Sequence, residues 1–255
     1  MTGETPPAEV RAAAEAVFGD RLPMAERYAR SLLTDGVVRG LIGPGEASRI
    51  WERHLLNCAV VAELVPPNAA VTDVGPGAGL PGVVLAVVRP DLPVTLVEAK
   101  ERAAGYLTEV VRALGLDQQV TVVRARAEEG AGRLPPAGVV TARALAPLDR
   151  LAGWCLPLAA VGGVVLALKG ASAEAEVAQY EAAVRRLGGA EPVIRRCGVG
   201  LLAEPTTVVA IVRDREPPVR GRGGRSGRVD RSSRVDRSGR VDRSGRADRH
   251  RGDHR

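Results

Sequence analysis

The residues best suited to ligand chemistry lie in one stretch, from Val71 to Gly82, which reads VTDVGPGAGLPG. The apolar run from Ala69 to Val74 predicts a buried strand that carries Asp73, and glycines follow at positions 75, 77, 79 and 82. Glycines permit tight turns with positive φ and let backbone N–H groups approach a ligand, while the next helix adds its positive end. The stretch therefore predicts a loop that binds a polar ligand.

Two registers of this loop predict different ligands. Residues 77–82 match the dinucleotide pattern G-x-G-x-x-G, but the apolar run ends at Val74, and Pro76 lacks the N–H that a strand would need. The other register places Asp73 two residues before glycines 75, 77 and 79, which resembles the first motif of class I S-adenosylmethionine methyltransferases. Glu98 ends the next apolar run and can accept hydrogen bonds from both hydroxyls of a ribose in either register. The second register favours a methyltransferase over a nicotinamide enzyme or a purely structural turn.

Length and composition limit the other possibilities. The 255 residues, 45% of them apolar, suffice for one large domain with appendages. Apolar stretches fall short of the roughly 18 residues of a membrane span, and the N-terminus lacks a signal pattern, so we expect a cytoplasmic protein without a membrane partner. Three dispersed cysteines, Cys58, Cys155 and Cys197, predict neither a metal site nor a disulfide framework, and we expect them to be reduced and buried.

The net charge of +6 is concentrated at the C-terminal end. Residues 220–255 hold 13 Arg and 5 Asp, whereas residues 1–219 carry a net charge of −2. A six-residue unit with the form RSGRVD occurs four times between Arg225 and Asp248. One small apolar residue in six cannot bury enough surface to fold, so we expect a disordered tail. Its arginines are compatible with an arm that binds polyanions without sequence preference and with a tolerated repeat expansion.

From residue 69 onward, short apolar runs alternate with helical stretches, which predicts a doubly wound, mostly parallel α/β sheet. The predicted strands are 69–74, 93–98, 119–124, 137–142, 162–168, 191–197 and 206–212. The predicted helices lie near 80–88, 100–114, 125–131, 147–158 and 173–187, and three more precede the sheet near 9–18, 24–34 and 46–65. Only a loop separates the last two strands, so we expect them to be antiparallel. The expected domains are a helical arm or cap at 1–66, a catalytic domain at 67–215 and the tail at 216–255.

Several motifs make the resemblance to one methyltransferase family specific. They are WERHLLN at 51–57, DVGPGAGLPGVVLAVVRP at 73–90, LVE at 96–98, RAEE at 126–129, ARA at 142–144 and LKG at 168–170. With them, about residues 20–213 resemble the glucose-inhibited division protein B family, the 16S ribosomal RNA guanine-N7 methyltransferases. The resemblance implies a seven-stranded, Rossmann-like class I fold with S-adenosylmethionine as cofactor. It also implies 16S ribosomal RNA or the assembling small ribosomal subunit as partner. We expect no metal, because the sequence shows no cluster of metal ligands, and we expect a monomer. Asn57-Cys58 departs from the family pattern, which often has Asp-Ser there.

The resemblance also implies the site residues. It assigns cofactor contacts to Gly75, Leu80, Ala127, Glu128 and Arg143, and the logic of the fold adds Asp73, Gly77 and Glu98. Guanine N7 has a lone pair and no proton, so it can attack a methyl group without a general base, and positioning becomes most of catalysis. Arg143, after the fourth strand, is expected to hold the base or its phosphate.

The remaining candidates are Lys169, Arg53 and His54. Lys169, after the fifth strand, is expected to contact a phosphate. Arg53 and His54 are candidates for tying the arm to the cofactor edge. A surface ion pair for Arg143, a solvated lysine and a core histidine are the structural alternatives. A non-catalytic RNA-binding protein with the same fold and an NAD-dependent oxidoreductase are the functional alternatives.

Overall fold

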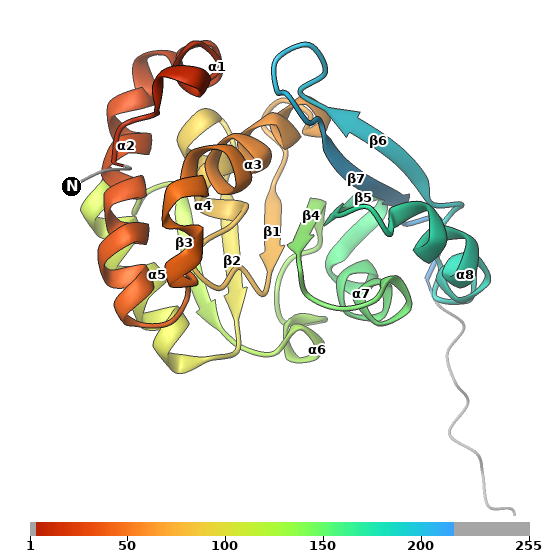
Figure 1. Ribbon diagram of the computed structural model, residues 1–255. Helices are drawn as coiled ribbons and strands as arrows, with labels where there is room; N and C mark the ends of the chain where they lie inside the picture. The colour runs from red at the N-terminus through yellow and green to blue at the C-terminus, as the bar shows by residue number, and fades with distance from the viewer. Residues whose placement is uncertain (1–3, 217–255) are drawn as a thin grey trace, which may run out of the picture. The chain divides into compact units, whose positions relative to one another are not determined.

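Seven strands form a single sheet in the order β3-β2-β1-β4-β5-β7-β6 (Figure 1). The computed structural model describes residues 4–216, except for the side chains at positions 44 and 47. The strands are β1 (Val71–Val74), β2 (Val94–Glu98), β3 (Val120–Arg124), β4 (Ala137–Arg143), β5 (Ala159–Lys169), β6 (Val193–Cys197) and β7 (Thr206–Val212). The first five are parallel, and β7 runs antiparallel to both β5 and β6. This confirms the predicted seven-stranded class I sheet with one reversed strand.

Helices cover both faces of this sheet (Figure 1). The helices of the first face are α1 (Ala8–Phe18), α2 (Leu22–Ser31), α3 (Asn57–Ala59), α4 (Gly82–Val88) and α5 (Glu101–Leu114). Those of the second are α6 (Ala127–Gly130), α7 (Leu148–Cys155) and α8 (Ala173–Arg186). Successive strand residues enter opposite cores: Val139 of β4 packs on the first face and Val140 on the second, and both are fully buried. Valine-rich strands without a polar face are what a sheet covered on both sides requires.

The segment before β1 is helical but irregular. Besides its α-helices it contains the 3-10 segments η1 (Gly19–Arg21), η3 (Pro44–Arg49) and η5 (Val60–Leu64) and the π-helical segments η2 (Leu32–Gly36) and η4 (Ile50–Leu56). The single helix predicted over 46–65 is thus replaced by η3, η4, α3 and η5. Tyr28 and Trp51 of this arm are buried in the same core as α4 and α5. Such π-helical turns occur frequently at functional sites, and η4 carries two of the predicted site residues, Arg53 and His54.

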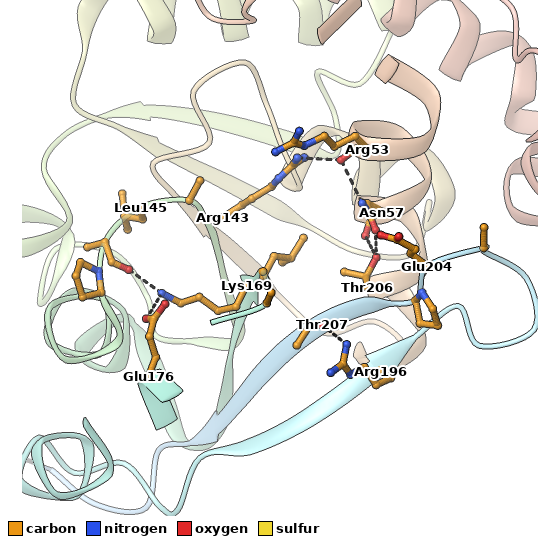
Figure 2. A pocket seen from close by; sticks show the side chains of 18 residues that line it. Arg53, Asn57, Arg143, Leu145, Lys169, Glu176, Arg196, Glu204, Thr206 and Thr207 are labelled. Atoms are coloured by element: carbon orange, nitrogen blue, oxygen red, sulfur yellow. Dashed lines mark hydrogen bonds and ion pairs between the residues drawn. The ribbon is translucent and has the colours of Figure 1, made fainter. Parts of the chain in front are cut away.

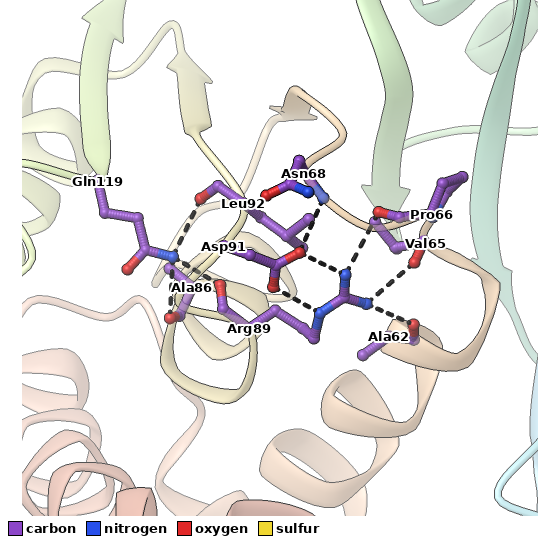
Figure 3. A network of polar contacts seen from close by, with 9 residues as sticks. All are labelled: Ala62, Val65, Pro66, Asn68, Ala86, Arg89, Asp91, Leu92 and Gln119. Carbon is purple, nitrogen blue, oxygen red and sulfur yellow. Dashed lines mark hydrogen bonds and ion pairs between the residues drawn. The ribbon is translucent and has the colours of Figure 1, made fainter.

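A polar network ties the arm to the sheet at the amino ends of the strands (Figure 3). The Arg89 guanidinium donates two hydrogen bonds of 2.7 Å to the Asp91 carboxylate. Its remaining N–H groups reach the backbone oxygens of Ala62, Val65 and Pro66, at the end of the arm. The Gln119 amide donates to the carbonyls of Ala86, Arg89 and Leu92. These bonds supply side-chain donors to backbone carbonyls at and just beyond the ends of η5 and α4, and they fix the arm on the first face.

Three further predictions concern the cysteines, membrane spans and the C-terminal repeat. Cys58, Cys155 and Cys197 are all unpaired and buried, as expected. Within residues 4–216, no helix combines the length and apolar character needed to cross a membrane. The arginine repeat and its predicted disorder fall outside the described residues.

Candidate active site

The glycine loop lies at the carboxyl end of β1. Gly75 and Gly77 have φ values of +65° and +58°, which L-residues with a side chain rarely adopt. A Cβ at Gly75 would also stand 2.6 Å from the Cδ1 atom of Leu145, in the loop after β4. Gly77 N–H donates to Glu98 Oε2 at 3.1 Å. The first two glycines therefore allow the loop to pack against the ends of both neighbouring strands.

Asp73 supports the loop from beneath. It is fully buried; its Oδ2 accepts from Gly82 N–H at 2.6 Å, and its Oδ1 accepts from the Thr141 hydroxyl at 2.9 Å. Burial raises the pKa of Asp73 to about 7, and the two hydrogen bonds oppose this shift. Leu80 is 8% exposed and packs with the arm. Both residues were predicted as cofactor contacts, and the structure places both behind the loop and outside the cleft described next.

A cleft of about 660 Å³ opens in front of the glycine loop, at the carboxyl ends of β1, β2, β3 and β4. The predicted cofactor residues that line it are Gly75, Gly77, Glu98, Ala127 and Glu128. The cleft is also lined by Gly40 and Leu41 of the arm and by Leu145 and Trp154. The carboxyl edge of a parallel sheet, at the point where strand order reverses, is where such folds bind ligands.

Glu98 fits the ribose of a nucleoside cofactor in this cleft. Its Oε1 accepts from Lys100 N–H at 2.8 Å and its Oε2 accepts from Gly77 N–H. The residue is only 5% exposed, but it lines the cleft. A carboxylate has about four acceptor positions, so two remain for ribose hydroxyls after the backbone bonds are made. The same bonds fix the carboxylate before any ligand arrives.

A second cleft, of about 830 Å³, is shown in Figure 2. It is bordered by the ends of β4 and β5, by the start of β7 and by η4. Its charged residues are Arg53, Arg143, Lys169, Glu176, Arg196 and Glu204. Ala144 and Leu145 line both clefts, so one short wall separates the two spaces. The lining holds four cations and two carboxylates, but Arg53, Lys169 and Arg196 each form an ion pair with a glutamate.

Arg143, the last residue of β4, is held by the arm. Its Nη1 donates to Cys58 Sγ at 3.2 Å, and its Nη2 donates to the backbone oxygen of Arg53 at 2.9 Å. The same Nη2 lies 3.1 Å from His54 Nδ1. Burial raises the pKa of the Cys58 thiol, and the charge of Arg143 opposes this shift. Arg53 and His54 thus connect the arm to Arg143, which borders the second cleft.

Lys169, the last residue of β5, also borders the second cleft, but its ammonium group is paired. Nζ lies 2.7 Å from the backbone oxygen of Ala146 and 2.7 Å from Glu176 Oε2. Its side chain is 9% exposed. In this arrangement Lys169 holds the loop after β4 and α8 together (Figure 2). A direct phosphate contact would require it to leave Glu176.

The wall between the clefts has an unusual backbone. Ala144 adopts a φ of +50°, which is uncommon for a residue with a Cβ. Such conformations persist where the surroundings determine them, and they cluster at functional sites. Here Leu145 packs against Gly75 on one side, and Lys169 binds Ala146 on the other. Both contacts hold the wall in place.

Comparison with known proteins assigns the family. Residues 21–200 match the model of the family described as rRNA small subunit methyltransferase G. The chain belongs to this family. It is therefore an S-adenosylmethionine-dependent methyltransferase, and the first cleft has the glycine loop and ribose acid that such a cofactor needs. Family membership favours neither the NAD-dependent oxidoreductase nor the non-catalytic binding protein.

Individual relatives align with this chain over almost their whole length. The chain is 59% identical over 233 residues to the ribosomal RNA small subunit methyltransferase G of Salinispora tropica, covering 87% of this chain and 96% of the relative. It is 52% identical over 231 residues to the protein of the same name from Streptomyces coelicolor, covering 88% and 95%. Among solved structures, a mitomycin 7-O-methyltransferase superposes with a TM-score of 0.53 at 16% identity, covering 81% of this chain and 69% of that one. The last likeness shows the fold alone.

Sequence reasoning missed several residues that line the two clefts. Leu145 and Trp154 line the first cleft, and Asn57, Thr206 and Thr207 line the second one. Leu145 follows Arg143 by two residues, so its place beside the ARA motif was a usable signal. Thr206 reaches Asn57, 149 residues earlier, through its hydroxyl group, and no local pattern indicates that contact. Residues 4–216 contain no group of three or more metal-ligating side chains.

Proposed function

We propose that this methyltransferase modifies N7 of a guanine in the 16S RNA of the small ribosomal subunit. The observation that supports this best is the pair of clefts that meet at Ala144 and Leu145. One cleft suits the cofactor, and the other is rich in cations and presents Arg143. The names of the relatives, which are ribosomal RNA small subunit methyltransferases, support the RNA substrate.

In this proposal, cofactor contacts come from Gly75, Gly77, Glu98, Ala127 and Glu128. S-adenosylmethionine supplies a methyl group on a sulfonium, and this group is the electrophile. The lone pair of guanine N7 forms the new N–C bond as the C–S bond breaks, and the sulfur keeps the electron pair of that bond. The positive charge passes from sulfur to the base, and no proton moves. The chain must therefore align the reactants rather than supply an acid or base.

Arg143 is the proposed catalytic residue for this alignment. A guanidinium has five N–H donors, and three of them are taken by Arg53, His54 and Cys58. Two remain for guanine O6 or a phosphate oxygen in the second cleft. Lys169 is proposed to position the wall through Ala146. Asp73 and Leu80 are proposed to support the cofactor loop without touching the cofactor.

Single-turnover transfer from labelled S-adenosylmethionine to small-subunit RNA and to intact small subunits tests this function. Arg143→Ala should slow transfer about 100-fold, which corresponds to about 2.7 kcal/mol of lost alignment. Arg143→Lys should recover little, because an ammonium lacks the planar fork. Arg195→Ala is the matched control, because Arg195 is exposed on β6 and lies outside both clefts. Its rate at saturating RNA should equal that of the parent.

The labelled product identifies the reaction. Nucleosides from the RNA should contain 7-methylguanosine when separated by mass spectrometry. Label at another atom or base would refute the proposed substrate. RNA and cofactor binding without transfer to either substrate would support the non-catalytic alternative. Parental rates for Arg143→Ala at saturating cofactor and RNA would show that Arg143 is not catalytic.

A further inference from the structure

Arg143 is linked to the arm through two further side chains, which come from different elements. His54 of η4 places Nδ1 3.1 Å from Arg143 Nη2, and its Nε2 lies 2.9 Å from Glu46 Oε2 of η3. The His54 side chain is 11% exposed, and that of Glu46 is 29% exposed. The imidazole is therefore held on both nitrogens, by a cation on one side and by a carboxylate on the other.

These contacts determine where the imidazole carries its proton. A guanidinium only donates hydrogen bonds, so Nδ1 must accept with its lone pair. Nε2 then bears the hydrogen and donates it to Glu46. Burial and the neighbouring charge of Arg143 lower the pKa of His54, although Glu46 acts in the opposite direction. His54 is thus neutral at pH 7, in the tautomer protonated at Nε2.

The lone pair of His54 completes the set of acceptors around Arg143. Arg53 O and His54 Nδ1 take the two hydrogens of Nη2, and Cys58 Sγ takes one hydrogen of Nη1. The other hydrogen of Nη1 and the Nε hydrogen then point in directions fixed by the rest of the fork. Removing the acceptor at Nδ1 frees one edge of the guanidinium to rotate. The orientation of Arg143 thus depends on the state of His54.

We propose that Glu46 and His54 are positioning residues that orient Arg143 for methyl transfer, and that protonation of His54 releases it. This inference rests on the catalytic role proposed for Arg143. A protonated ring would place an N–H donor against a guanidinium and remove an acceptor. The groups that face this pair are Glu46 and Arg49 from η3, Arg53 from η4, Cys58 from α3 and Arg143 from β4. Cations outnumber the single carboxylate among them, which disfavours an added positive charge.

NMR titration of the full chain labelled with ¹⁵N-histidine tests the proton position directly. The sequence has three histidines, His54, His250 and His254, and His54→Asn identifies the signal of interest. We expect unprotonated Nδ1, protonated Nε2 and a pKa below the ordinary value of about 6.5. Arg143→Ala should raise that pKa, and Glu46→Gln should lower it. A proton on Nδ1, or a pKa that Arg143→Ala leaves unchanged, would overturn the inference.

Transfer rates between pH 5.5 and 8 test the consequence for catalysis. Because N7 loses no proton, the chemistry itself predicts no decline in acid, and a decline in the parent should follow the pKa measured for His54. In His54→Asn, Oδ1 replaces Nδ1 as an acceptor and cannot titrate. Its rate should stay within about threefold of the parent at pH 8 and should lose the acid decline. His54→Ala should be at least tenfold slower at every pH, with unchanged cofactor affinity.

The outcomes separate this inference from the proposed function. A parent that forms no 7-methylguanosine refutes the function, while the NMR experiment still decides the state of His54. An active parent whose acid decline persists in His54→Asn refutes the His54 switch and points instead to Asp73, whose pKa is raised to about 7 by burial. Equal rates for His54→Ala and the parent refute the positioning role. Rescue by asparagine but not alanine supports it, because a merely structural residue would show no such dependence on the acceptor.

Discussion

Gly82, at the start of α4, has the tightest surroundings in the cofactor loop, and Gly82→Ala should therefore be costly. A Cβ there would stand 2.7 Å from Asp73 Oδ2 and 2.9 Å from Asp73 Cβ, and closer still to the Leu96 side chain. Neither neighbour can yield easily, since Asp73 and Leu96 are fully buried in β1 and β2. Backbone movement at Gly82 would also lengthen its hydrogen bond to Asp73, now 2.6 Å.

The size of the effect follows from these contacts. Overpacking a close-packed core by one methyl group costs roughly 1–3 kcal/mol, and weakening a buried hydrogen bond to a carboxyl group costs a similar amount. One displacement relieves both contacts, so the two amounts do not add, and we expect a loss of about 3 kcal/mol. For a chain of this size, Tm changes by roughly 2–4 °C per kcal/mol, which predicts a fall of about 6–12 °C. Cofactor affinity should fall as well, because the Asp73 bond sets the loop.

Thermal and urea unfolding of the full chain measures this loss, and Gly105→Ala provides the matched control. Gly105 lies in α5, is exposed and has no atom within 4 Å of a Cβ added there. The same substitution should thus stabilise the chain by roughly 0.5–1 kcal/mol through helix propensity. A Gly82→Ala variant that melts within 1 °C of the parent would show that the loop adjusts freely and would refute the role assigned to the Asp73–Gly82 contact.

Two more predictions concern the carboxylates of the site. Because burial raises the pKa of Asp73 to about 7, its stabilising contribution is fully present below about pH 4 and is lost as the pH rises through 7. The unfolding free energy of the parent, from urea titrations, should fall between pH 5 and 7 by roughly 1.4 kcal/mol per pH unit because of this group, and Asp73→Asn should remove that part; parallel profiles would contradict it. Glu98→Ala should weaken S-adenosylmethionine binding by roughly 1–3 kcal/mol in calorimetry, because two ribose hydroxyls lose their acceptor. Glu101→Ala, in an exposed position at the start of α5, is its control, and equal affinities for the two variants would remove Glu98 from the site.

The sheet could be predicted because its signals are local. Short valine-rich runs separated by glycine, proline and amphipathic stretches identify buried strands and the helices between them. The arm was predicted less well. Ile50, His54 and Cys58 share a face in an α-helix, and all three are buried as that pattern suggests. The pattern cannot distinguish α-helical from π-helical turns, which differ by one residue in hydrogen-bond register. Tertiary contacts that form as the chain folds select that hydrogen-bond register.

The site residues also divide into those with a local sequence signal and those whose contacts appear only in the folded chain. Gly75, Gly77 and Glu98 could be placed at the cleft because their roles depend on their own backbone and on the end of their own strand. The acid before the glycines indicates that the loop needs an acceptor, but it does not tell on which side of the loop the acceptor lies. Asp73 lies beneath, where it meets Gly82 and Thr141. The partners of Arg143 are 85 to 90 residues away in sequence, so only the folded chain reveals them.

The proposed reaction explains why residues so distant must meet at this wall. In the proposed reaction the methyl group of the sulfonium and N7 of the base must meet in line at the edge of the wall formed by Ala144 and Leu145, where the two clefts adjoin. A misplacement of about 1 Å costs on the order of 100-fold in rate. The wall is held by Gly75, which leaves room for Leu145, and by Lys169, which binds Ala146. In the proposed reaction no proton transfer compensates for poor alignment, so we expect the rigidity of these contacts to set the rate, and we expect the arm to contribute by fixing Arg143.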